Sequence, residues 1–323
     1  MEFFKYKHSL DFMGKSKIAM TISIVLILAS YAILAIKGLN YGIDFAGGTI
    51  VQIKYDTKAP IKEMREQLKG NKLFDNASIT EFGSPDEVVI RMKTTTKNVT
   101  QDIGDVTREA LKNTGNFEIR RVDIVGPKVG NELKEKGLMA LFLSVAAILV
   151  YVAFRFEWRF AIASIVALIH DVSIAMGAVA LFNIDVNLDV LAAILTLLGY
   201  SLNDTIIVFD RIREGIVKSK NVNLAEIINE SVTRTLARTT LTSLTTFFVV
   251  FTLFMFGGEI IHAFAFTLLV GIIVGTYSSI FVASPILMLF GFDVKKYHIK
   301  LAEKAKHEAE KERMRAQFES GVM

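Results

Sequence analysis

The run IAMTISIVLILASYAILAI (18–36) decides the fold class, because it is long and apolar enough for a helix to cross a bilayer. Comparable runs recur along the chain. The six expected spans are 18–36, 137–154, 159–182, 188–209, 236–256 and 263–290. Of the 323 residues, 52% are hydrophobic while 22% are charged, and the mean hydropathy is +0.42. The sequence therefore predicts an α-helical membrane protein with six transmembrane helices.

The first run also resembles a signal peptide, since the basic residues Lys15 and Lys17 precede it. It is longer than the apolar core of such a peptide, and no convincing cleavage site follows, so we expect it to remain as an anchor. Basic residues flank alternate ends of the spans, as Arg155 and Arg211 do. Such residues favour the cytoplasmic side. We therefore expect both termini to be cytoplasmic and residues 38–136 to be periplasmic.

The segment 38–136 is polar and large enough to fold as a domain of its own. Its strand-like runs are 48–55, 77–82, 87–93 and 117–124, and its helix-like runs are 61–69 and 98–113. The order βαββαβ predicts a small ferredoxin-like α+β domain. We expect four parts: a cytoplasmic N-terminus with the first transmembrane helix at 1–37, the periplasmic α+β domain at 38–136, transmembrane helices two to six at 137–292, and a charged cytoplasmic tail at 293–323.

Glycines mark both connections of this domain to the membrane helices. Gly47 and Gly48 precede its first strand, and Gly130 follows its last one. One interpretation is turn chemistry at a domain junction. The other is a pair of hinges that lets the domain tilt. The charged tail is expected to be either an exposed helix or disordered, with some attraction to anionic lipids.

Three ionisable residues lie inside the expected spans: Asp171, Asp204 and Arg238. Each costs about 2.5–3.5 kcal/mol at the centre of a bilayer, so each needs a partner, water or a function. Asp171 follows His170, and the two suggest either a proton relay or a packed polar pair. Asp204 and Arg238 lie at similar depths in neighbouring, antiparallel spans, which predicts that they meet. The hydroxyl-rich stretch after Arg238 suggests a hydrated seam.

Small residues recur every four positions in the last span, including Gly271 and Gly275, which is typical of close helix packing. The chain has no cysteine, which excludes disulfides and thiolate chemistry. It also has no phosphate-binding loop of the Walker type and no histidine–glutamate spacing of a metalloprotease. We therefore expect no enzyme activity, no metal and no cofactor. An ion gradient or the ATPase of a partner is the expected energy source.

Several motifs together resemble those of the SecF family. They are GLNYGIDFAGGT (38–49), VGPKVGNEL (125–133), FEWR (156–159), LGYSLNDTIIVFDRIRE (198–214), LARTTLTSLTT (236–246), FGGE (256–259) and GTYSSIFVASP (275–285). The match covers essentially the whole chain in order. The resemblance implies half of a transporter of the resistance–nodulation–division superfamily, in the inner membrane of a bacterium. It also implies that Asp204 and Arg238 carry the proton path of the family. At both positions this sequence has the residue that the family's motif requires.

The same resemblance implies partners. They are SecD as the second half, the SecYEG channel, YajC, the translocating preprotein and membrane lipids, with no role for nucleic acid. It implies an auxiliary of protein export that uses the proton gradient. Two other functions stay open: a half-sized exporter of small molecules or lipids that works as a homodimer, and a structural subunit without gradient coupling. The small periplasmic insert disfavours the exporter, and the buried charges disfavour the scaffold.

Overall fold

The computed structural model of the chain describes residues 9–69, 71, 73–75, 77–92, 102–218, 223–291 and 294–319. The expected start of a helix at Asn98 lies outside these residues. Within these described ranges, six helices are long and apolar enough to cross a membrane, as expected. They are α1 (Ser16–Lys37), α5 (Pro127–Arg155), α6 (Trp158–Leu181), α7 (Leu188–Lys218), α8 (Leu224–Phe256) and α9 with α10 (Gly258–Ser278 and Ser284–Leu289).

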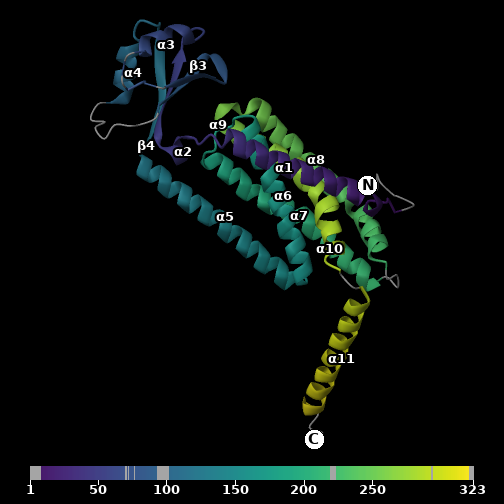
Figure 1. Cartoon of the computed structure of the whole chain (residues 1–323). Coiled ribbons are helices and arrows are strands. Elements are labelled where there is room, and N and C mark those ends of the chain that lie inside the picture. Colours follow the sequence, from purple (N-terminus) through teal and green to yellow (C-terminus); the bar gives the residue numbers. More distant parts are fainter. Residues whose placement is uncertain are drawn as a thin grey trace.

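The membrane helices differ in how far they are buried. In the apolar windows, 61% of α6 and 50% of α7 is buried, whereas α1, α5 and α8 reach only 11–17%. Helices α6, α7 and α9 thus form the centre of the bundle, and Figure 1 shows α5 along one side of it. An apolar core of α6 and α7 residues such as Phe160, Phe209 and Ile212 fills the interior. The outer helices present apolar faces to lipid or to another subunit.

The soluble part is a four-stranded antiparallel sheet in the order β2-β3-β1-β4. The elements are β1 (Gly48–Tyr55), α3 (Ile61–Leu68), β2 (Ser78–Phe82), β3 (Ser84–Met92), α4 (Ile103–Leu111) and β4 (Phe117–Val125). This is the expected βαββαβ order. Alternate residues of β1, including Val51, Ile53 and Tyr55, pack against α3 and α4. Figure 1 shows this sheet domain at one end of the bundle.

Two further helices lie outside this plan. The short α2 (Ile43–Ala46) connects α1 to the sheet, and α11 (Val294–Glu319) projects from the bundle as a charged helix (Figure 1). The helix α5 begins at Pro127, whereas the sequence predicts a span only from Gly137. Proline suits the first turn of a helix, so the helix starts in the polar stretch before its apolar run. The membrane helix is therefore continuous with the edge of the sheet domain.

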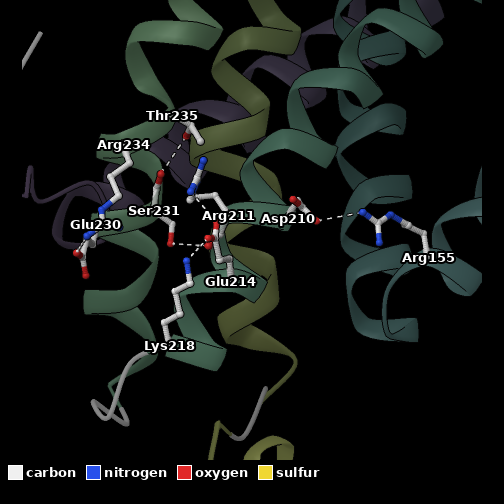
Figure 2. A network of polar contacts seen from close by, with 9 residues as sticks. All are labelled: Arg155, Asp210, Arg211, Glu214, Lys218, Glu230, Ser231, Arg234 and Thr235. Carbon is white, nitrogen blue, oxygen red and sulfur yellow. Dashed lines mark hydrogen bonds and ion pairs between the residues drawn. The ribbon is translucent and has the colours of Figure 1, made fainter. Parts of the chain in front are cut away.

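Charged side chains gather at the end of the bundle far from the sheet (Figure 2). Arg155 of α5 pairs with Asp210 of α7 at 3.3 Å, and the Ser231 hydroxyl of α8 donates to the Arg211 carbonyl of α7 at 3.2 Å. The remaining ion pairs join residues of one helix: Arg211–Glu214, Lys218–Glu214 and Arg234–Glu230. Exposed pairs of this kind add little stability each. Their main effect is to keep this end of the bundle solvated.

Candidate functional site

Asp171 lies in the middle of α6 and is completely buried. One carboxylate oxygen, Oδ2, accepts hydrogen bonds from the Ser201 hydroxyl of α7 at 2.5 Å and the Ser278 hydroxyl of α9 at 2.8 Å. The other oxygen lies 2.8 Å from Nδ1 of His170. This carboxylate thus joins the three central helices, and both of its oxygens are engaged.

His170 is also buried, with 1% of its surface exposed. Its Nε2 atom has no hydrogen-bond partner among the described residues. The ring stacks on Tyr277, with the centroids 6.3 Å apart, and the Tyr277 hydroxyl donates to the Ala19 carbonyl of α1 at 2.7 Å. The pair therefore also reaches α1. Its contacts fit a packed polar pair, and the free Nε2 atom leaves the proton-relay interpretation open.

Asp204 is a second buried carboxylate, one turn after Ser201 on α7, with 1% of its surface exposed. Its Oδ2 atom accepts a hydrogen bond from the Ser243 hydroxyl of α8 at 3.1 Å. The Ser243 hydroxyl in turn accepts from Thr276 of α9 at 2.8 Å. Oδ1 of Asp204 has no partner among the described residues. Asp204 therefore holds a carboxylate oxygen available to a proton, water or another group.

The two carboxylates belong to one polar seam between α6, α7, α8 and α9. We call it the hydroxyl seam and define it by Asp171, Ser201, Asp204, Ser243, Thr276 and Ser278. Sequence reasoning found the hydroxyls of α8 but missed Thr276 and Ser278. The sequence does contain a pattern that indicates them, because GTYS (275–278) places polar residues inside an apolar span. The same residues also fit the small-residue spacing of close helix packing, which accounts for them without a polar role. A π-helical segment, Ser279–Ala283, begins directly after the seam, and such segments are frequent at functional sites.

The expected meeting of Asp204 and Arg238 is wrong for the chain by itself. Arg238 is exposed on α8 and forms no ion pair with Asp204 in the part of the chain that the structure describes. Arg238 precedes Ser243 by five residues, which is roughly 140° around the helix. Since Ser243 faces Asp204, Arg238 points to the outside of the bundle. Matching depth in the bilayer was not sufficient to predict contact, because helix rotation also decides it.

The glycines of the last span lie where α9 crosses α7. A methyl group added to Gly271 would lie 2.5 Å from a side-chain carbon of Leu197, and one added to Gly275 would lie 3.1 Å from the Ser201 Cβ. Only small residues allow such an approach. This approach brings Ser201 and Ser278 to the same carboxylate, so the packing of the glycines shapes the hydroxyl seam.

The junction glycines pack closely against each other. A Cβ atom on Gly130 would lie 3.1 Å from the backbone nitrogen of Gly47, and one on Gly47 would lie 2.9 Å from the Cα of Pro127. Gly47 and Gly48 have φ angles of +72° and +152°, which side chains rarely adopt. The contacts explain why glycine stands at these positions, and the hinge role stays a prediction.

Comparison with known proteins assigns the chain to a family. Residues 106–293 match the model of the C-terminal part of protein export membrane protein SecD/SecF, and residues 32–59 match the SecD/SecF GG motif, a range that includes Gly47 and Gly48. A protein translocase subunit SecF of Helicobacter pylori is 49% identical over 99% of both chains. The chain belongs to the SecF family. Another SecF, of Vibrio alginolyticus, is 44% identical over 96% of this chain and 98% of that one.

A solved structure shows the same fold. The crystal structure of SecDF from Thermus thermophilus, described as a translocon-associated membrane protein, superposes with a TM-score of 0.79 at 33% identity. The match covers 88% of this chain but only 39% of the SecDF chain. The SecF-like chain thus corresponds to less than half of that larger protein.

Proposed function

We propose that this chain is the SecF half of a proton-driven auxiliary of protein export, completed by a SecD-like half. The observation that carries the proposal is the division of the charges. Asp204 lies in the hydroxyl seam with one oxygen unpaired, while Arg238 lies on the outer face of α8. A cation in a membrane span needs a partner or water. A second half that covers α8 would supply it, and the larger length of the SecDF chain supports such a half.

In this proposal the N-terminus and the α11 tail are cytoplasmic, and the sheet domain is in the periplasm of a bacterial cell. The preprotein, the SecYEG channel and YajC are the proposed neighbours. Asp204 takes up and releases a proton, and the state of its carboxyl biases the packing of α7 against α8 and α9. One charge that crosses a potential of 100 mV supplies about 2.3 kcal/mol, which is sufficient to shift a two-state helix arrangement.

The partner is tested by purification of the tagged full chain from its own membranes in mild detergent. We expect a SecD-like polypeptide in equal amount. Substitution of Arg238 by glutamate reverses the charge on the outer face of α8 and should weaken this complex. Recovery of homodimers only would contradict the proposal and support a half-sized exporter.

The use of the gradient is tested with Asp204→Asn, which keeps the shape of the side chain but cannot exchange a proton. We expect the complex to assemble while gradient-driven export and proton flux into vesicles are lost. Ser243→Ala is the matched variant, because it removes the hydrogen bond to Asp204 but leaves the carboxyl. It should retain most of the flux. Export at the wild-type level by Asp204→Asn would support a purely structural subunit.

A further inference from the structure

The loop between α6 and α7 is bonded to the segment that leads from α1 to the sheet. The Val186 amide donates to the Asn40 carbonyl at 2.7 Å, and the Gly42 amide donates to the Val186 carbonyl at 2.9 Å. The Leu188 amide donates to the Asp44 carboxylate at 3.0 Å. These three contacts make residues 40–46 and the loop 183–188 one unit, which we call the base. Helix α6, which carries Asp171, ends just before the loop of this base, and helix α7, which carries Asp204, begins at its last residue.

The sheet is attached to the base at two crossings of the chain. One crossing is Gly47–Gly48, in backbone conformations that favour glycine. The other is Gly126–Pro127, between β4 and α5. Hinges of this kind consist of a few residues at the ends of elements that absorb the backbone rotation. In the proposal made below, these two crossings are the axis about which the sheet domain turns.

A side-chain contact reaches across these crossings. Arg91 of β3 donates through Nη1 to the carboxylate of Asp185 in the loop. The side-chain amide of Asn40 donates through Nδ2 to the same carboxylate. The Asp185 side chain is 18% exposed and that of Arg91 is 40% exposed. Other ion pairs of the domain, such as Lys54–Asp86, lie within the sheet and cannot fix it to the base. Arg91 is therefore placed to hold the sheet in its present orientation.

A cleft of about 370 Å³ lies beside this contact. Its sheet wall includes Gln52 and Val89, and its other wall includes Asn187 of the base and His262 of α9. The sheet and the bundle are therefore not packed together over this area. Rotation of the sheet would change the width of the cleft without disrupting a hydrophobic core.

We propose that Arg91 and Asp185 form a latch that sets the orientation of the sheet domain on the base. The latch ties the domain directly to the loop between α6 and α7. Movement of these two helices would thus reach the sheet without passing through α1 and α5. The existence of the latch is independent of the proposed function, and its use to transmit movement from Asp204 rests on it.

The test uses the absence of cysteine from this chain, because two introduced cysteines are then its only sites for spin labels, and any cysteine of the partner is replaced beforehand. Gln67 on α3 and Leu181 at the end of α6 are exposed positions on the two sides of the crossings. The full chain, purified with its bound partner and placed in lipid nanodiscs, carries labels at Gln67→Cys and Leu181→Cys. We expect one dominant distance by pulsed electron paramagnetic resonance.

Arg91→Ala leaves the Asp185 carboxylate without its cation, so a second distance should appear. The ratio of open to latched molecules should rise about five- to tenfold. The exchange of both charges, Arg91→Asp with Asp185→Arg, should restore the first distance. Lys54→Ala is the matched control, because it breaks the Lys54–Asp86 ion pair within the same sheet, and neither of these residues lines the cleft. An unchanged distance in Arg91→Ala would overturn the latch, as would a failure of the exchange to restore it.

Discussion

Asp171 and Asp204 are two buried carboxylates of one bundle with very different surroundings. Asp171 contacts Ser201, Ser278 and His170 through both oxygens, whereas Asp204 contacts Ser243 through one oxygen only. A carboxylate with both oxygens engaged stabilises the groups that donate to it. One with a free oxygen can exchange a proton without loss of a partner. The comparison indicates a mainly structural role for Asp171 and an exchanging role for Asp204.

The largest effect on stability is expected from Asp171→Ala. Loss of the carboxylate removes the acceptor of two buried hydroxyls and the partner of His170, at a cost of about 3 kcal/mol or more. Thermal unfolding in detergent should show a much lower midpoint than for the wild type. Asp171→Asn can place its amide oxygen where Oδ2 lies and accept from both hydroxyls, so it should be milder. An unfolding midpoint of Asp171→Ala equal to that of the wild type would contradict the structural role of Asp171 and remove its contrast with Asp204.

A second variant disturbs Asp171 indirectly. The Cβ of Gly275→Ala would lie 3.1 Å from the Ser201 Cβ, so Ser201 must shift by a few tenths of an ångström and its hydrogen bond to Asp171 should lengthen. Overpacking of this kind costs about 1–3 kcal/mol. The matched control is Gly199→Ala on α7, where an added methyl group meets nothing within 4 Å. Equal unfolding midpoints for the two variants would show that the close approach carries no stability.

The third prediction concerns Asp204→Asn, which should leave stability almost unchanged. The amide oxygen can still accept the bond from Ser243, so we expect a change below about 1 kcal/mol. The unfolding midpoint should stay near the wild-type value while gradient-driven export is lost. A large loss of stability in Asp204→Asn would assign a structural role to both carboxylates and remove the contrast between them.

The sequence was sufficient for the spans and the strand order but not for the directions of side chains. Hydropathy predicts the helices because an apolar run of sufficient length has few alternatives in a membrane. The direction of Arg238 depends on the rotation of α8, which its neighbours fix. The loop 183–187 (NIDVN) contains no motif that predicts a contact with the sheet. Its Asp185 pairs with Arg91, about 94 positions away in the chain, and no local pattern announces such a contact.

The smallest effect is a dependence of the latch on pH. Burial raises the pKa of Asp185 above its ordinary value of 3.8, and the Arg91 guanidinium opposes this rise. In the open state the carboxyl returns to water and to its ordinary pKa. The carboxyl therefore binds a proton more tightly in the latched state than in the open state. Acidification through the raised pKa stabilises the latched state relative to the open state. This stabilisation is complete once the pH is below the ordinary pKa of 3.8.

Arg91→Ala should enlarge this dependence, because the pKa of Asp185 rises further once the guanidinium is gone. The open fraction of this variant should shrink as the pH falls, and the change should begin at a higher pH than in the wild type. The charged and titratable groups that line the same cleft are Asp44, Glu81, Arg121, Asp123, Asp189 and His262. Of these, histidine ordinarily titrates nearest to neutral pH, so His262→Asn in the Arg91→Ala background is the control. The labels at residues 67 and 181 report the open fraction at each pH. A wild-type open fraction that grows on acidification would mean that the attraction of the Arg91–Asp185 ion pair, and not the burial of its carboxylate, governs the latch.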